Sequence, residues 1–338
     1  MASPLSFLSM SLALFSLTIL LLPAVHGIGV NYGLLGSNLP DPNATLSLLE
    51  SRNIRKIRIF DPNSSVLDAL RGRNTSVFIG VKNEDLQALA TDPASAAAWV
   101  SAHVQPYAAS VSIAGVVAGN EVIPGPLAQY VERAMGSLDE ALKAANVTAP
   151  VSTAVSYAVM GSSYPPSAGS FSDDASEVMQ GVARFLAARK YPLLANIYPY
   201  FAYISDPDNI SPEYTFFTST VPVVVDGELN YFNLLDSMVD ALYSALERVE
   251  ATSVEVVVSE TGWPSAGDKY ATLENAKLYN QNLVKHVESG DGTPKRAGKK
   301  LEAYIFAAFN ENQKPAGTEQ NFGLYYPNLT EVYHVDFP

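Results

Sequence analysis

The 338-residue chain, with 48% hydrophobic residues, is long and apolar enough to bury one large core, so a single barrel-sized domain is expected. Its formal net charge of −13 disfavours nucleic acid and anionic membrane surfaces as partners and is compatible with a neutral polymer. The lack of cysteine excludes disulfide bonds, thiol catalysis and thiolate zinc sites.

The first 27 residues predict a secretory signal peptide. They carry no Asp, Glu, Lys or Arg, and the segment 12–22 is strongly apolar before Pro23 and a small-residue site ending at Gly27. A membrane anchor is the alternative, which the shortness of the apolar run disfavours. Secretion also suits the six Asn-X-Ser/Thr sequons. These begin at Asn43, Asn63, Asn74, Asn146, Asn209 and Asn328.

Eight short apolar runs alternate with helical or loop segments in the rest of the chain. The runs are 28–33, 54–61, 76–83, 111–121, 149–157, 193–203, 254–260 and 301–312. Helical patterns begin near Asn43 and Ser64 and cover 94–103, 127–146, 173–190, 231–248 and 272–289. This alternation predicts an α/β fold, a closed (β/α)8 TIM barrel, as one domain over residues 28–338. An open doubly wound sheet is the alternative, disfavoured because no glycine-rich phosphate loop follows the first run.

Two of these runs end in a glutamate. Four of the five residues at 254–258 are valine, which is typical of a strand buried on both faces, and Ser259-Glu260 follows them. The run 111–121 is also apolar and ends in Asn120-Glu121. A carboxylate at the carboxyl end of a buried strand is costly without a partner or a function, and that end of a parallel barrel carries chemistry. A helix cap or a structural ion pair is the alternative for each glutamate alone.

The fourth and seventh strands lie three apart in an eight-strand ring, so Glu121 and Glu260 are expected to face each other across the barrel mouth. Glycoside hydrolysis needs such a pair, one carboxyl to donate a proton and one to stay ionised. Their proximity itself separates their pKa values. At a separation of about 5–5.5 Å the reaction would retain the anomeric configuration. We predict Glu260 as nucleophile, Glu121 as acid and then base, and Asn120 as a donor to the sugar 2-hydroxyl.

The segments Ala118-Gly119-Asn120-Glu121 and Ser259-Glu260-Thr261-Gly262-Trp263-Pro264 resemble the two signatures of the plant family 17 glycoside hydrolases, the β-1,3-glucanases. Further similar blocks at 28–33, 58–63, 196–200 and 309–314 occur in the same order, and the resemblance runs from residue 28 to about residue 337. The family is a barrel with its acid on strand four and its nucleophile on strand seven. The resemblance therefore implies the same two roles for Glu121 and Glu260.

The resemblance also implies a supporting pair, Glu311 and Lys314, at the rim of strand eight, where it would orient or tune Glu260. A surface ion pair of little energetic value is the alternative. Glu319 lies in another similar block without an assigned task. Five aromatic residues are candidates for stacking on glucose rings, although each could instead fill the barrel core. They are Tyr32, Tyr198, Phe201, Trp263 and Phe322.

Three positions depart from the family pattern. Asn31 stands where the family usually has cysteine, Phe60 where tyrosine is common, and Ala118 where valine is usual. Phe60 therefore lacks a hydroxyl that could hydrogen bond to the substrate. The histidines after the predicted leader are scattered, so neither a metal cluster nor a Ser-His-Asp triad is indicated. We expect no metal and no organic cofactor.

Together these features predict an endo-acting, retaining hydrolase of β-1,3-glucans such as callose, laminarin or fungal wall glucan. We expect a monomer in the plant extracellular space, at the cell wall, without nucleic-acid or membrane partners after signal removal, and plant defence is one role it would suit. A β-1,3-1,4 mixed-linkage glucanase on the same barrel is one alternative. A catalytically silent glucan-binding protein is another, disfavoured by the two intact glutamates.

Overall fold

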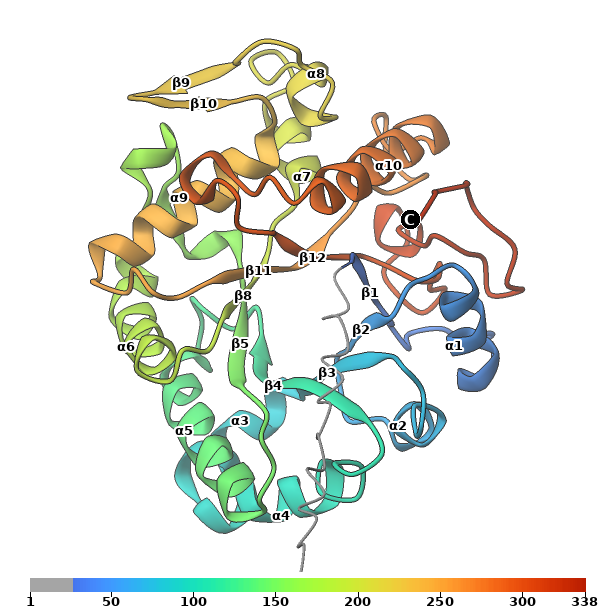
Figure 1. The fold of residues 1–338 in the computed structure, drawn as a ribbon, viewed down its shortest axis with the longest axis vertical. Coiled ribbons are helices and arrows are strands. Elements are labelled where there is room, and N and C mark those ends of the chain that lie inside the picture. The colour runs from blue at the N-terminus through green and yellow to red at the C-terminus, as the bar shows by residue number, and fades with distance from the viewer. Residues whose placement is uncertain (1–26) are drawn as a thin grey trace, which may run out of the picture.

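Valine- and isoleucine-rich runs form the wall of a closed barrel in the computed structural model, which describes residues 27–338 (Figure 1). Eight parallel strands surround the axis in sequence order, and the last pairs with the first. They are β1 (Gly29–Asn31), β2 (Lys56–Ile59), β3 (Ser76–Val81), β4 (Ser112–Asn120), β5 (Val151–Ser156), β8 (Leu193–Asn196), β11 (Val256–Thr261) and β12 (Glu302–Ile305). The predicted TIM barrel is confirmed. The predicted signal peptide lies, apart from Gly27, outside the described residues.

Each predicted apolar run supplies one strand, but three boundaries were wrong. The sixth strand ends at Asn196 rather than residue 203, because Pro199 begins helix α7 (Pro199–Ser205). The eighth ends at Ile305, after which the backbone of residues 306–310 hydrogen bonds both to the neighbouring strands and to residues 322–325. The helix predicted from Tyr231 begins at Leu234, where the Asn233 side chain caps α9 (Leu234–Arg248).

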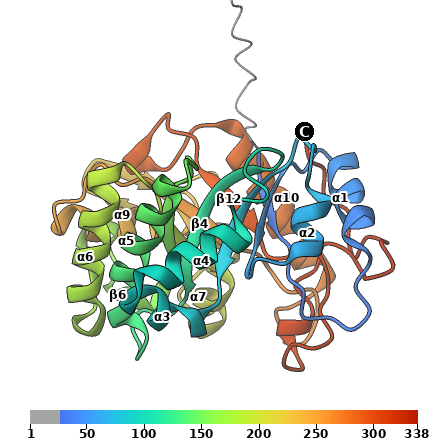
Figure 2. The same cartoon turned by 90° about the horizontal axis from the view of Figure 1, so that it is seen from below.

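Helices pack around the outside of the barrel and cover its apolar wall (Figure 2). The longer ones are α1 (Pro42–Ser51), α4 (Pro93–His103), α5 (Ala128–Ala144), α6 (Asp173–Arg189), α9 and α10 (Leu273–Ser289). The shorter ones are α2 (Ser64–Ala69), α3 (Leu86–Thr91) and α8 (Pro212–Thr215). Caps fall slightly earlier than predicted, at Asp41 for α1 and at Asn63 for α2. Among residues 27–338 no helix combines the length and apolarity needed to cross a bilayer.

The barrel interior is filled by a small core of its own. It consists of Phe78, Val117, Ala154, Leu194, Val257 and Tyr304. A much larger core lies between the strands and the surrounding helices. Since the interior is packed, a ligand can enter only at an end of the barrel, among the loops.

Two short hairpins extend the loops that follow β5 and β8. The first pairs β6 (Met160–Ser162) with β7 (Ser170–Phe171), and the second pairs β9 (Val224–Asp226) with β10 (Leu229–Tyr231). Asp226 joins them, since its carboxylate accepts hydrogen bonds from the N–H and the hydroxyl of Ser167 at 2.6 and 2.8 Å. They form a wall on one side of the barrel mouth.

A buried acidic group lies between α9 and α10. Asp240 is fully buried and accepts the N–H of Lys295 at 2.8 Å, while Asp236 contacts Nε2 of His286 at 2.8 Å. Burial raises the pKa of Asp240 to about 6. Burial alone would lower the pKa of His286, but its hydrogen bond to Asp236 and the charge of Asp236 outweigh this and raise it. Both side chains therefore hold a proton to higher pH in the folded protein than ordinary Asp and His side chains do.

We expect the raised pKa of Asp240 to stabilise the protein at acidic pH. The contribution is full below the unfolded pKa of about 3.9 and is lost as the pH rises through about 6. Relative to Asp240→Asn, which does not titrate, the wild-type free energy of unfolding should fall by on the order of 2–3 kcal/mol between about pH 4 and pH 7. Urea unfolding across this range measures it. If the free energy of unfolding changed with pH in the same way for both proteins, the expectation would be contradicted.

Candidate active site

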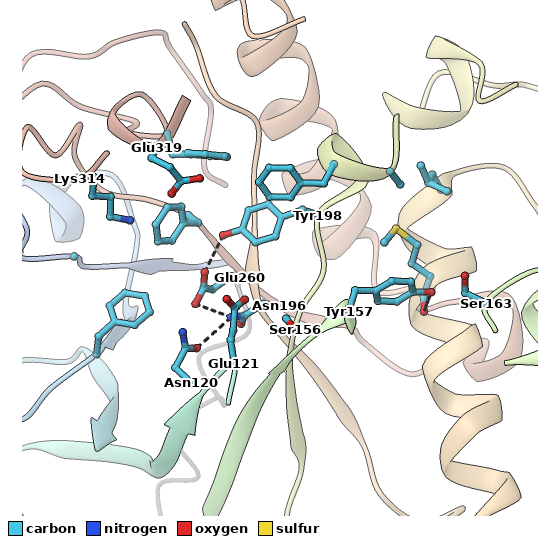
Figure 3. Close-up of a pocket in the computed structure, with 18 of the residues that line it drawn as sticks. Asn120, Glu121, Ser156, Tyr157, Ser163, Asn196, Tyr198, Glu260, Lys314 and Glu319 are labelled. Atoms are coloured by element: carbon cyan, nitrogen blue, oxygen red, sulfur yellow. Dashed lines mark hydrogen bonds between the residues drawn. The ribbon is translucent and has the colours of Figure 1, made fainter. Parts of the chain in front are cut away.

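The carboxyl ends of the barrel strands open into a cleft of about 1430 Å³. Loops following all the barrel strands except β11 contribute to its lining, and β11 contributes Glu260 itself. Glu121 and Glu260 were predicted to face each other across the barrel mouth. Both line this cleft and point toward one another (Figure 3).

Irregular backbone aims each glutamate into the cleft. The pairing of β11 with β8 shifts register between Val258 and Glu260, and that of β4 with β5 shifts between Val117 and Asn120. Such bulges redirect side chains at the rims of barrels. Glu121 also has a φ of 56°, in the left-handed region that non-glycine residues seldom adopt. Neither feature is visible in the hydrophobic pattern that located the strands.

One amide group links the two carboxylates. Nδ2 of Asn196, the last residue of β8, donates to Oε1 of Glu121 at 2.8 Å and to Oε1 of Glu260 at 2.9 Å. The two oxygens can therefore be no farther apart than the sum of these distances, close to the roughly 5–5.5 Å typical of retaining glycosidases. The hydroxyl of Ser259 donates to Oδ1 of Asn196 at 2.7 Å and fixes the orientation of the amide.

A buried arginine, to which the sequence interpretation gave no role, is the cationic partner of the site. Arg58 is 1% exposed on β2, where its Nη1 donates to Glu260 Oε1 and its Nη2 donates to Asn120 Oδ1, both at 2.6 Å. Charge-assisted hydrogen bonds of this kind are about twice as strong as neutral ones. The signal that could have revealed it is the position of Arg58 between the two apolar residues Ile57 and Ile59, which places a charge inside a strand.

Asn120 is held with its amide nitrogen available. Its Oδ1 accepts from Arg58 and, at 3.1 Å, from Asn196 Nδ2. Within residues 27–338, its own Nδ2 donates no hydrogen bond to the protein. The donor required by the predicted contact with a sugar hydroxyl therefore lies beside the two carboxylates.

Tyr198, predicted to stack on a sugar, instead contacts a carboxylate directly. Its hydroxyl donates to Glu260 Oε2 at 2.8 Å. Burial, together with the nearby charge of Glu260, raises the pKa of Tyr198 well above its usual value, so the hydroxyl stays protonated. Glu260 thus accepts hydrogen bonds from Arg58, Asn196 and Tyr198, an arrangement that suits a carboxylate ion.

Glu121 has the opposite environment. Burial and the charge of Glu260 raise its pKa, against the smaller effects of the Asn196 hydrogen bond and the Arg58 charge. Glu319 lines the same cleft and adds a smaller contribution of the same sign. Glu121 therefore keeps a proton to higher pH than an ordinary carboxyl group. The two glutamates differ in the way that a proton donor and its ionised partner must differ.

Glu311 and Lys314 lie at the cleft but not as a surface pair. Glu311 is 3% exposed, and its Oε1 accepts the N–H of Leu35 at 2.7 Å. Lys314 Nζ lies 3.5 Å from Glu311 Oε2 and 4.0 Å from the centroid of the Phe306 ring. The pair thus joins the segment after β12 to the loop after β1. In the described part of the chain neither side chain hydrogen bonds to Glu260, so their influence on it stays a prediction.

The other predicted stacking residues have different environments. Phe201 lines the cleft and is 44% exposed, whereas Tyr32 and Phe322 line it but are almost fully buried. Trp263 is fully buried beneath the cleft floor, packs on Tyr200, and donates from Nε1 to a backbone carbonyl. The expectation that Trp263 stacks on glucose was therefore wrong, because α7 and its neighbours enclose the indole.

Several cleft aromatics were not among the predicted stacking residues. Phe60 and Phe306 flank the carboxylates, and Tyr157 and the 73% exposed Tyr164 lie near the first hairpin. Nothing in the local pattern separates them from the many core aromatics. Asn31, one of the departures from the family pattern, is fully buried and donates from Nδ2 to the Ser259 carbonyl at 3.0 Å, supporting the end of β11. Among residues 27–338 no group of three or more Asp, Glu or His side chains could hold a metal ion.

The Arg58–Glu260 pair should be strongly coupled in stability, because removing one member leaves a buried charge unpaired. We expect Arg58→Met to lower the free energy of unfolding by about 3–5 kcal/mol. In a Glu260→Gln background, Arg58→Met should lower the free energy of unfolding by clearly less, since the glutamine amide carries no charge. Urea unfolding of the wild type, both single variants and the double variant measures the coupling. Equal losses in the two backgrounds would contradict it.

A sequence profile of the glycosyl hydrolases family 17 matches residues 28–337. A glucan endo-1,3-beta-glucosidase of Vitis vinifera is 46% identical over 319 residues, covering 92% of this chain and 92% of that protein. Lichenase-2 of Hordeum vulgare is 44% identical over 316 residues, covering 93% of this chain and all of that protein.

Solved structures show the same similarity. CJP38, a beta-1,3-glucanase and allergen of Cryptomeria japonica pollen, superposes with a TM-score of 0.89 at 44% identity, covering 92% of this chain and 99% of that one. The profile match covers nearly the whole described chain, and the relatives share well over 30% of their residues with it. The chain therefore belongs to the glycosyl hydrolases of family 17.

Proposed function

We propose that the protein is an endo-acting, retaining hydrolase of β-1,3-glucans, with Glu260 as nucleophile and Glu121 as acid and then base. The observation that carries this proposal is the Asn196 amide within hydrogen-bond distance of both carboxylates, inside an open cleft. Two carboxyl oxygens that share one amide donor are close enough for the double displacement of a retaining hydrolase, which supports this assignment.

In the first step a carboxylate oxygen of Glu260 attacks the anomeric carbon. The bond from that carbon to the glycosidic oxygen breaks, and Glu121 gives its proton to the leaving oxygen. The product is a covalent glycosyl-enzyme and a free sugar end. The raised pKa of Glu121 keeps its proton available at mildly acidic pH, and Arg58, Asn196 and Tyr198 hold the attacking carboxyl group of Glu260 in place.

In the second step Glu121, now ionised, removes a proton from a water molecule that attacks the same carbon. The bond to Glu260 breaks, and the sugar leaves with its original configuration. Arg58 and Tyr198 hold the two oxygens of Glu260 throughout, so little reorganisation is needed at the moment of reaction. The free Nδ2 of Asn120 is the donor we assign to the sugar 2-hydroxyl.

The extent of the cleft supports endo action. Lys314 and Glu319 line one side of the carboxylate pair, whereas Tyr157 and Ser163 line the other (Figure 3). A polymer can thus lie on both sides of the scissile bond. The exposed ring of Phe201 and the ring of Phe60 offer stacking surfaces, and Glu311 with Lys314 fixes the rim.

We place the protein outside the cell, at the plant cell wall, as a monomer. The proposal rests on the apolar leader at residues 1–27 and on the sequons, whose asparagines are exposed at positions 43, 74, 146, 209 and 328. The β-1,3 linkage rests on the resemblance of the motifs and on relatives named for that activity. Lichenase-2 is a comparably similar relative, so a mixed-linkage substrate remains the second candidate.

Glu121→Gln should remove the proton donor without disturbing the fold. Its kcat on laminarin should fall by about 10²–10⁴-fold. In the wild type, kcat/KM should decline as the pH rises through the raised pKa of Glu121, because the acid must be protonated, and the variant should lack that limb. Reducing-sugar assays across pH measure both effects, with circular dichroism as the control for folding. Near-normal activity in Glu121→Gln would contradict the assignment.

The products should show both the stereochemistry and the linkage. NMR of early products from laminarin should show the β-anomer first, because two displacements occur at one carbon. Chromatography should show oligosaccharides of several lengths, with faster cleavage of laminarin than of barley mixed-linkage glucan. Faster cleavage of the mixed-linkage polymer would favour the second candidate. Binding of laminarin with no release of reducing ends would identify a silent binding protein.

A further inference from the structure

The backbone that carries Glu121 leaves the regular sheet just before this residue. On the side of β3, the pairing of β4 ends at the Val81–Ala118 pair. On the side of β5 it continues, since the N–H of Glu121 donates to the Ala154 carbonyl at 2.8 Å. Asn120 therefore has β5 on one side, and on the other side β3 has already ended.

A side chain takes the place of the missing strand. Nδ2 of Asn83 donates to the Asn120 carbonyl at 3.0 Å, and the N–H of Asn120 donates to Asn83 Oδ1 at 2.8 Å. One carboxamide thus satisfies both backbone groups of Asn120, as a neighbouring strand would. Asn83 begins the 3₁₀ turn Asn83–Asp85, through which the chain leaves β3 for α3.

These two hydrogen bonds, called the Asn83 clamp below, act where the backbone conformation is strained. Gly119 and Glu121 have φ values of 84° and 56°, on either side of the clamped residue. A non-glycine residue in the left-handed region is strained and persists only where its surroundings hold it. The Asn83 amide on one side and the Ala154 carbonyl on the other supply that restraint.

We propose that Asn83 is a positioning residue, which holds the Asn120–Glu121 backbone so that the Glu121 carboxyl lies opposite Glu260. It acts through Asn120, because its side chain hydrogen bonds to both the carbonyl and the N–H of that residue. The inference rests on the proposed role of Glu121 as acid and base. If the clamp is lost, Glu121 should move while Glu260, held from β2 and β8, stays in place.

The test is Asn83→Ala, with Asp85→Ala as matched control. Asp85 lies in the same 3₁₀ turn, outside the cleft lining, and its side chain makes no capping hydrogen bond to α3. On laminarin we expect Asn83→Ala to lower kcat by about 10–100-fold with KM nearly unchanged, because a small displacement of a reacting group is enough for such a loss. Asp85→Ala should behave as the wild type.

A second substrate distinguishes a misplaced Glu121 carboxyl from a general disruption of the active site. 2,4-Dinitrophenyl β-laminaribioside has a leaving group that needs no protonation, so its kcat/KM reports attack by Glu260 alone. We expect the loss in kcat/KM for Asn83→Ala to be at least about tenfold smaller on this substrate than on laminarin. Azide, which attacks the glycosyl-enzyme without a general base, should raise the turnover of the variant more than that of the wild type.

Equal losses on the two substrates, or no loss on laminarin, would overturn the positioning role. Wild-type protein and Glu121→Gln run alongside test the proposed function separately: an inactive wild type refutes the function, whereas an active wild type with an equally active Asn83→Ala refutes only the clamp. If Asn83→Ala does not fold, Asn83→Asp serves instead. It keeps the acceptor for the Asn120 N–H but loses the donor, and should show the same substrate dependence to a smaller extent.

Discussion

Two carboxyl groups held side by side in a partly buried cleft are the constraint on which the site depends. Their charges repel, and each loses hydration on burial, so the pair is unfavourable unless the protein supplies compensating groups. Arg58, Asn196 and Tyr198 all donate to Glu260, whereas among residues 27–338 only Asn196 donates to the Glu121 side chain. The two carboxyl groups thus differ in their hydrogen-bond donors, and burial together with the charge of Glu260 raises the pKa of Glu121.

The barrel provides the rigid frame for this pair but does not complete it. Regular parallel strands bring their carboxyl ends to one rim. The register shifts near Glu260 and Asn120, and the left-handed backbone of Glu121, adjust the direction of the last side chains there. Side-chain amides such as Asn83 and Asn31 then satisfy backbone groups at strand ends.

Aromatic side chains serve two distinct purposes near the cleft. Tyr200 packs edge-on and Phe216 tilted against the buried Trp263, and these contacts hold α7, whose N-cap residue is Tyr198. Phe201, one residue along the same helix from Tyr200, projects into the cleft instead. Neighbouring residues of similar chemistry thus divide between support and ligand contact, and only the direction of each side chain on a short helix separates them.

Local pattern in the sequence was sufficient to predict the alternating strands and helices, and hence the type of fold. It also placed the two glutamates at strand ends. Both were predictable because hydrophobic periodicity, and the Gly and Pro residues that end strands, act over a few residues. The partners of those glutamates depended on the tertiary structure. Asn196 and Glu121 are 75 residues apart and Arg58 and Glu260 are 202 apart, so their contacts arise only when the barrel closes. The burial of Trp263 was likewise decided by packing, since the same motif is compatible with an indole in the cleft or beneath it.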